Sequence, residues 1–213
     1  SIGTAGEVKQ FLDNKNELAE INISDLVELY DQISKYWMSK ECKVSDLLAQ
    51  EGMGFLIPWL SKTNIRNLLT QNFQDLLSLD HPQYNSDLRY YLYGRPAGVS
   101  VHWIAGNVPV LGVISLFQTM ITKNKSIVKV PLVFKDTLPT ILNDLLNNSF
   151  FPEKISVILE TALTQVLLIY IEKDDIKAQK DLSLKADIRI CWGGIDAVNS
   201  IIGLPKKINC RDL

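Results

Sequence analysis

The stretch that decides the fold reads GVSVHWIAGNVP and covers residues 98–109. Its first half, 99–104, is a short run of β-branched and aromatic side chains, which predicts a strand. Gly106 and Asn107 follow, and the apolar positions of 110–122 then recur at helical spacing. A strand that passes through a short turn into a helix is the first half of a βα unit.

The same alternation continues toward the C-terminus. We predict further strands over 126–130, 166–171 and 187–192, and helices over 136–147, 153–163, 174–183 and 194–202. Strand 166–171 is apolar throughout, as parallel strands covered on both faces tend to be. The fold class is therefore α/β, a Rossmann-like parallel sheet of four strands with helices on both faces.

The chain before residue 80 follows a different pattern. Its apolar positions over 5–79 recur at helical spacing, so we expect a region made of helices, with Ser24 capping one and Ser45 starting another. Residues 81–85 are turn formers, and the aromatic stretch 89–93 predicts a short strand. We divide the chain into a helical region, 1–80, and a Rossmann-like cofactor-binding domain, 81–213.

Composition excludes several classes of protein. The chain has 213 residues, 46% of them hydrophobic, so it can bury a core and is not disordered. Lys and Arg number 22 against 24 Asp and Glu, with no basic cluster, so we expect no nucleic-acid partner. The two most apolar stretches, 108–121 and 155–171, contain polar residues and are shorter than the roughly 20 residues of a membrane span.

Cysteine and histidine are too sparse for a disulfide framework or a metal site. Cys42, Cys191 and Cys210 form no C-x-x-C pair, and His81 and His102 are the two histidines. Cys191 lies in an apolar strand, which predicts a buried, inert thiol. With no secretory signal in the first residues, we expect a cytoplasmic protein.

Ligands of open α/β sheets bind beyond the carboxyl ends of the strands. The candidate binding residues therefore lie at the strand ends or just after them, namely Ile104, Ala105, Gly106 and Asn107 for the first, Lys129 and Pro131 for the second, and Trp192, Gly193 and Gly194 for the last.

Each of these junctions has two interpretations from the residues alone. The amide of Asn107 could donate a hydrogen bond to an oxyanion or cap the following helix. The ammonium of Lys129 could contact an anionic ligand or extend into solvent. The pair Gly193 and Gly194 lets a ligand approach the backbone or makes a tight turn, and no G-x-G-x-x-G pattern is present.

Three segments taken in order, 94–109, 123–131 and 186–194, resemble the LuxC-type acyl-CoA reductases, a branch of the aldehyde dehydrogenase superfamily that makes fatty aldehyde in bacterial bioluminescence. The helical segment GFLIPWL, 54–60, is also similar to that family, so the resemblance covers most of the chain. It implies an enzyme that transfers the acyl group of a long-chain acyl-CoA or acyl-carrier thioester to a cysteine and reduces it to the aldehyde with NADPH.

The resemblance also implies roles for the junction residues. Asn107 matches the superfamily's oxyanion-binding asparagine, and Lys129 matches the lysine that contacts the adenosine ribose. Gly193 and Gly194 match the turn beside the pyrophosphate and nicotinamide half of the cofactor. Members of the superfamily associate with copies of themselves, so a homo-oligomer is expected as well.

Two departures from the family pattern matter. Leu132 and Val133 follow Pro131 where many NAD-preferring relatives have a glutamate, which favours NADPH. The family's catalytic cysteine lies well downstream of the glycine turn, and the surroundings of Cys210 do not match it. We therefore expect the thioester-forming cysteine to lie outside this chain. The 213-residue chain alone would then not catalyse the reduction. The alternatives are a non-catalytic interaction protein with this fold and a nucleotide-binding protein unrelated to acyl reduction.

Overall fold

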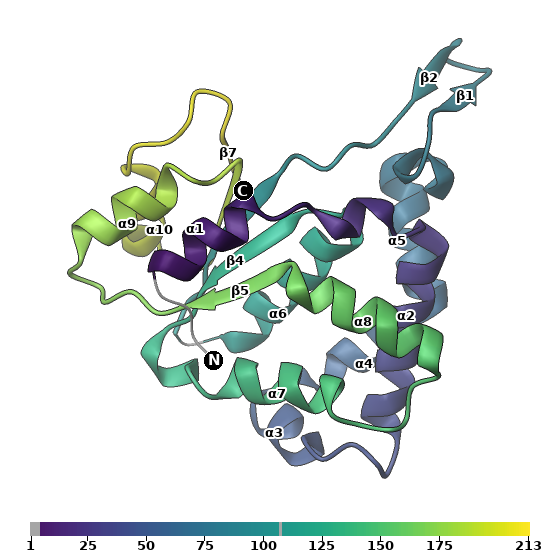
Figure 1. Ribbon diagram of the computed structural model, residues 1–213, viewed down its shortest axis with the longest axis horizontal. Coiled ribbons are helices and arrows are strands. Elements are labelled where there is room, and N and C mark those ends of the chain that lie inside the picture. Colours follow the sequence, from purple (N-terminus) through teal and green to yellow (C-terminus); the bar gives the residue numbers. More distant parts are fainter. Residues whose placement is uncertain (1–4, 107) are drawn as a thin grey trace.

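The computed structural model describes residues 5–106 and 108–213 (Figure 1). Within these residues a parallel sheet of five strands has the order β5-β4-β3-β6-β7. The strands are β3 (Val99–Trp103), β4 (Lys125–Lys129), β5 (Val166–Ile169), β6 (Ile188–Cys191) and β7 (Arg211–Asp212). Because the order reverses direction between β3 and β6, the sheet is of the Rossmann type, which confirms the predicted fold class.

Helices cover both faces of this sheet. One face carries α6 (Pro109–Ile121), α7 (Thr137–Leu146) and α8 (Glu153–Thr164), and the other carries α1 (Ala5–Asp13), α9 (Ile176–Ser183) and α10 (Ile195–Ile202). Successive strand residues serve opposite faces, so Val128 joins the first core and Ile127 the second. The sheet is thus buried on both sides.

The part of the chain before residue 80 that the structure describes is helical, as predicted. Besides α1, its α-helices are α2 (Ile23–Met38), α3 (Ser45–Gln50), α4 (Leu56–Trp59) and α5 (Lys62–Phe73). It also contains the short 3₁₀ helices η1 (Glu17–Glu20), η2 (Met53–Phe55) and η3 (Leu76–Leu79). A further 3₁₀ helix, η4 (Leu132–Phe134), follows β4. The Tyr30 hydroxyl of α2 donates to the Phe117 carbonyl of α6 at 2.6 Å. One continuous hydrophobic core joins both sides of residue 80, and the division there stays a prediction.

Ser24 does not cap α2, so this prediction is wrong. The helix begins at Ile23, and the Ile23 amide donates to the carboxylate of Asp80 at 2.9 Å. A side chain that is distant in sequence therefore satisfies the first turn of the helix. The predicted start at Ser45 is confirmed.

A small hairpin projects from the body of the molecule (Figure 1). The stretch predicted as a strand over 89–93 forms β2 (Tyr90–Leu92), which pairs antiparallel with β1 (Gln83–Asn85) outside the main sheet. The turn predicted over 81–85 is thus partly a strand. No helix in the described part of the chain is long and apolar enough to cross a bilayer.

Candidate functional site

A cavity of about 800 Å³ opens where the strand order reverses. Trp103 and Cys191 end β3 and β6 as register partners, and the Trp192 amide donates to the Trp103 carbonyl at 2.9 Å. From there the chain runs from β3 into α6 on one face of the sheet and from β6 into α10 on the other. Such a reversal leaves a crevice at the carboxyl ends of the two strands.

Three strand ends that are distant in sequence meet in this cavity. Among its lining residues are eight that the sequence predicts for ligand binding, Ile104, Ala105, Gly106, Lys129, Pro131, Trp192, Gly193 and Gly194. Their roles as cofactor contacts stay predictions. Asn107, the predicted oxyanion donor, lies outside the residues that the structure describes.

Close packing of α6 fixes the first strand end. A Cβ atom at Gly112 would lie 2.2 Å from Ile104 Cδ1 and 2.8 Å from Ile104 Cγ1. A side chain at this helix position would push Ile104 from its place, so the glycine brings α6 close to the end of β3. Ile104 in turn lines the cavity.

The charges in the cavity wall favour an anion. Lys129 and Lys173 line it together with one acid, Asp196. Burial lowers the pKa of Lys129, whose side chain forms no hydrogen bond or ion pair with the described residues. An anionic group beside this amine would stabilise its charged form and raise that pKa again.

One residue of the cavity wall, Trp192, carries an unused donor. The Trp192 indole N–H is buried and has no hydrogen-bond partner among the described residues. By contrast, the Trp103 indole donates to Gln179 Oε1 of α9 at 3.0 Å. A buried donor without a partner is unfavourable, so a ligand with an acceptor atom near Trp192 would stabilise the site.

One wall of the cavity consists of residues that were not predicted from the sequence. Tyr170 and Lys173 follow β5, and Gln179 comes from α9. The first two obey the same strand-end rule that identified Lys129, and applying it to β5 would have found them. Gln179 lies within a helix and carries no comparable signal.

The three thiols are held in the protonated form. Burial raises the pKa of Cys191 to about 11 and also raises the pKa values of Cys42 and Cys210. Cys191 is half-buried and lines the cavity, so the prediction that it is buried is wrong. As a thiol with a raised pKa it is a poor nucleophile, and its inert role stays a prediction. No group of three or more His, Cys, Asp or Glu side chains in the described chain is placed to hold a metal ion.

Comparison with known proteins identifies the family of this chain. The family profile described as "Acyl-CoA reductase (LuxC)" matches residues 18–213. The chain belongs to the LuxC family. Two curated relatives support this, both long-chain acyl-protein thioester reductases. The one from Aliivibrio fischeri is 26% identical over 93% of this chain, and the one from Photorhabdus luminescens is 27% identical over 91%. This LuxC chain spans 42% and 41% of their respective lengths.

Solved structures place this LuxC chain in the aldehyde dehydrogenase fold. Lactaldehyde dehydrogenase from Escherichia coli matches 95% of the chain with a TM-score of 0.61 at 14% identity, over 42% of its own length. GapN of Methanocaldococcus jannaschii, a glyceraldehyde-3-phosphate dehydrogenase solved with NADP, matches 97% with a TM-score of 0.59 at 14% identity, over 46% of its own length. Propionaldehyde dehydrogenase of Rhodopseudomonas palustris, solved with propionyl-CoA, matches 99% with a TM-score of 0.59 at 13% identity, over 45% of its own length.

Proposed function

We propose that this LuxC chain forms the NADPH-binding part of an acyl thioester reductase, which converts a long-chain fatty acyl thioester to the aldehyde. The observation that carries the proposal is the meeting of three predicted strand ends in one cavity of about 800 Å³. Pockets for cofactors occupy about 300–1,000 Å³. The names of the curated relatives support the same reaction.

The cavity fits a dinucleotide in two respects. Its wall includes Trp192, whose buried indole N–H has no partner among the described residues, and it has open space at Gly194, where an added Cβ would meet no atom within 4 Å. Gly194 directly precedes α10, whose first backbone N–H groups have no acceptor within the helix. These groups together suit the oxygens of a diphosphate. When bound, NADPH supplies the hydride for the reduction.

The charges favour NADPH over NADH. Two lysines, Lys129 and Lys173, line the cavity. The residues after Pro131 are Leu132 and Val133, both more than half exposed and neither acidic. A 2′-phosphate on the adenosine ribose beside Lys129 would therefore meet a cation and no carboxylate from the residues that follow Pro131. The acid that lines the cavity, Asp196, belongs to α10.

The acyl-transfer half of the reaction needs a thiolate. Since Cys42, Cys191 and Cys210 all have raised pKa values, we assign the acyl group to none of them. Asn107 is proposed to donate its amide N–H to the oxyanion of the thioester, a contact of a few kcal/mol in such reactions.

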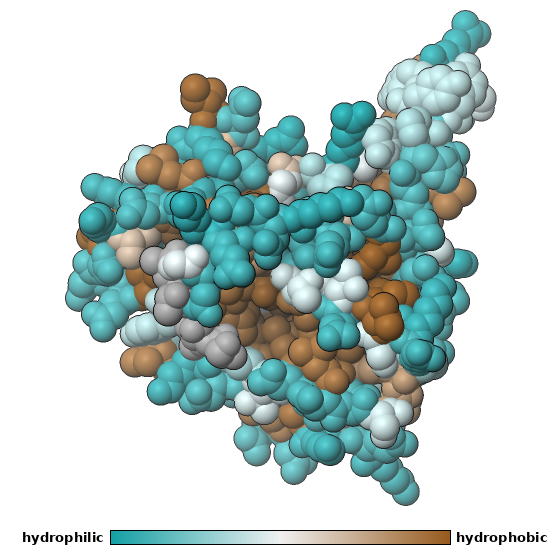
Figure 2. Space-filling model, viewed as in Figure 1, coloured by the Kyte–Doolittle hydropathy of each residue, from teal (hydrophilic) through white to brown (hydrophobic). Residues whose placement is uncertain are grey.

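The hairpin of β1 and β2 is proposed to bind a second copy of this chain. It exposes four tyrosines, Tyr84, Tyr90, Tyr91 and Tyr93, and stands apart from the body as a pale knob in Figure 2. A hairpin of two strands is marginally stable alone, and exposed tyrosines are typical of interface contacts. A homo-oligomer would cover both the strand edges and the rings.

The proposal is tested by titrating the 213-residue chain with NADPH and with NADH while following tryptophan fluorescence, with calorimetry as a second readout. Trp103 and Trp192 line the cavity and report on its occupancy. We expect saturable binding of both cofactors, with NADPH bound at least about tenfold more tightly, a difference of about 1.4 kcal/mol. Absence of binding at millimolar NADPH would overturn the cofactor assignment.

A further inference from the structure

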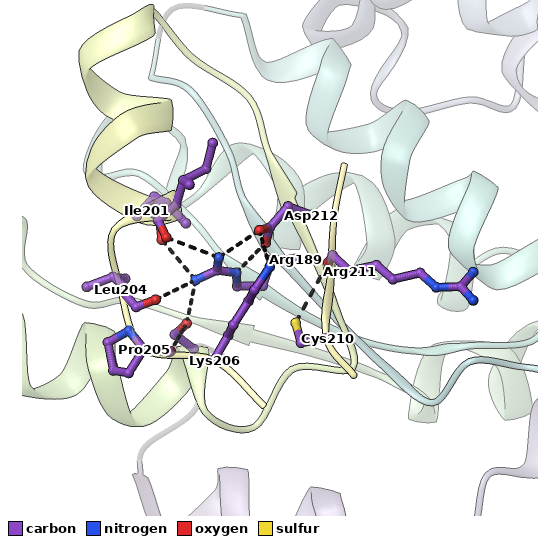
Figure 3. Close-up of polar contacts among 10 residues, drawn as sticks. Arg189, Ile201, Leu204, Pro205, Lys206, Cys210, Arg211 and Asp212 are labelled. Carbon is purple, nitrogen blue, oxygen red and sulfur yellow. Dashed lines mark hydrogen bonds and ion pairs between the residues drawn. The ribbon is translucent and has the colours of Figure 1, made fainter. Parts of the chain in front are cut away.

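A buried arginine, Arg189, contacts the end of α10, a helix that lines the cavity; Figure 3 shows its polar contacts. Arg189 of β6 is fully buried, with 0% of its surface exposed. Its register partner on β3 is Val101, which belongs to the core under α1, α9 and α10. The arginine side chain therefore extends toward the helices on that face of the sheet.

The guanidinium joins the end of α10 to β7. It forms a fork with Asp212, from Nε to Oδ1 at 2.6 Å and from Nη2 to Oδ2 at 2.9 Å. Nη1 donates to the carbonyls of Ile201 at 2.9 Å and Leu204 at 3.1 Å, and Nη2 donates to that of Ile202 at 3.4 Å. These carbonyls belong to the last turn of α10 and the residues just after it, and the end of a helix leaves its carbonyls without partners inside the helix.

The same side chain also reaches α9. Nη1 donates to Ser183 Oγ at 3.0 Å, and Ser183 Oγ donates to the Pro205 carbonyl at 2.7 Å. One cation thus bonds to groups from α9, α10 and β7 while belonging to β6. Removing it would take a donor from each of these groups, while the Ile201 carbonyl would still accept from the Leu204 amide at 3.0 Å and Asp212 from Lys206 Nζ at 2.6 Å. A buried acceptor left without a donor, as the Leu204 carbonyl would be, costs about 1–3 kcal/mol.

The helix that Arg189 holds forms much of the cavity wall. Residues 193–198, Ser200 and Ile201 line the cavity, so α10 contributes from its first turn to its last. A helix of eight residues is about 12 Å long and moves as a unit. A shift at the end held by Arg189 would therefore displace the turn at Gly193 and Gly194.

We propose that Arg189 is a positioning residue, which sets the place of α10 and thereby the affinity of the cavity for the dinucleotide. This inference rests on the proposed function. Asp212 acts with Arg189, because its carboxylate orients the guanidinium fork and also accepts from Lys206 Nζ at 2.6 Å.

The test compares Arg189→Met and Arg189→Lys with the control Lys123→Met. Lys123 forms a buried ion pair with Asp80 at 2.6 Å but does not line the cavity. Each variant is first shown to be folded by circular dichroism. We expect Arg189→Met to weaken NADPH binding about tenfold to hundredfold and Arg189→Lys to recover part of it, while the control is destabilised but binds as the wild type does.

Two further readouts separate positioning from general loss of stability. Methylguanidinium added to Arg189→Ala is expected to restore NADPH affinity. In the protein without cofactor, hydrogen exchange of amides 193–198 is expected to rise in Arg189→Met and not in Lys123→Met. Unchanged exchange over 193–198 would overturn the inference whether or not NADPH binds, and wild-type affinity in Arg189→Met would do the same. Failure of the wild type to bind NADPH would count against the proposed function alone.

Discussion

Trp103 and Cys191 are register partners at the carboxyl ends of β3 and β6, the two strands between which the order of the sheet reverses. The Trp103 side chain is held by Gln179 of α9, and the chain continues from Cys191 into the glycine turn before α10. These two strand ends set the position of the cavity. The proposed function requires that a dinucleotide binds in that cavity.

Lys129→Gln is expected to weaken NADPH binding about tenfold or more. A charge-assisted hydrogen bond to phosphate or ribose contributes about 1.5–3 kcal/mol. The matched control is Lys135→Gln, which removes the same charge from an exposed position nearby outside the cavity. Calorimetric titration measures both variants, and equal affinities for the two would contradict the role of Lys129.

Lys173→Gln is expected to reduce the preference of the protein for NADPH over NADH. Loss of one ammonium facing the 2′-phosphate should weaken NADPH several-fold and leave NADH nearly unchanged, because NADH has no such phosphate. Lys177→Gln, at an exposed position of α9 outside the cavity, serves as control. The ratio of the two dissociation constants is the readout, and a parallel loss for both cofactors would rule out a contact specific to the 2′-phosphate.

The sequence predicts well those strands and helices whose apolar residues recur at strand or helix spacing. The apolar strands β3, β4, β5 and β6 and the helices between them follow from periodicity. Periodicity does not predict the short polar strand β7, because Arg211 and Asp212 form a strand only by pairing with Ile188 and Arg189. A contact over many residues, Asp80 to the Ile23 amide, likewise sets the start of α2.

Some residues of the candidate site can likewise be predicted from the sequence, and others cannot. Lys129 and Trp192 can be predicted, because the carboxyl ends of parallel strands lie at one edge of the sheet. Arg189 gave no signal, since an arginine in a strand is ordinarily a solvated side chain. Its burial depends on the ends of α9 and α10 and on Asp212, which only the folded chain brings together.

Tyr91→Lys in the hairpin is expected to weaken self-association about tenfold or more, as loss of an interface tyrosine commonly costs over 1 kcal/mol. Tyr91 is 69% exposed and lies beside Tyr84, with the ring centroids 5.3 Å apart. Ile208→Lys, in a fully exposed position between α10 and β7, is the control. Sedimentation equilibrium measures all three proteins. A wild type that stays monomeric at every concentration would refute the oligomer, and equal association of both variants would refute the role of the hairpin.

His102 is expected to make the protein less stable as the pH falls below about 6.5. The imidazole is fully buried between β3 and α6, with Nδ1 3.0 Å from Ser115 Oγ, and burial lowers the pKa of His102 to about 3. Between these values the unfolded chain binds a proton that the folded chain does not. Stability is therefore complete above the unfolded pKa and decreases toward pH 3, by up to about 1.4 kcal/mol per pH unit.

Urea unfolding of His102→Gln between pH 7 and pH 4 checks this dependence, with His81→Gln as the control at an exposed histidine. His102→Gln should be less sensitive to pH than the wild type, even if it is less stable at pH 7. His81→Gln should follow the wild type. The same pH slope in all three proteins would show that His102 titrates alike in the folded and unfolded chains.

A crystal structure of the 213-residue chain with NADPH would show directly whether this cavity holds the cofactor. We expect the dinucleotide in the cavity at the ends of β3 and β6, with its 2′-phosphate near Lys129 and Lys173 and its diphosphate against the turn at Gly193 and Gly194. NADPH bound elsewhere, for example in the cavity of about 570 Å³ between α1 and α9, would contradict this expectation.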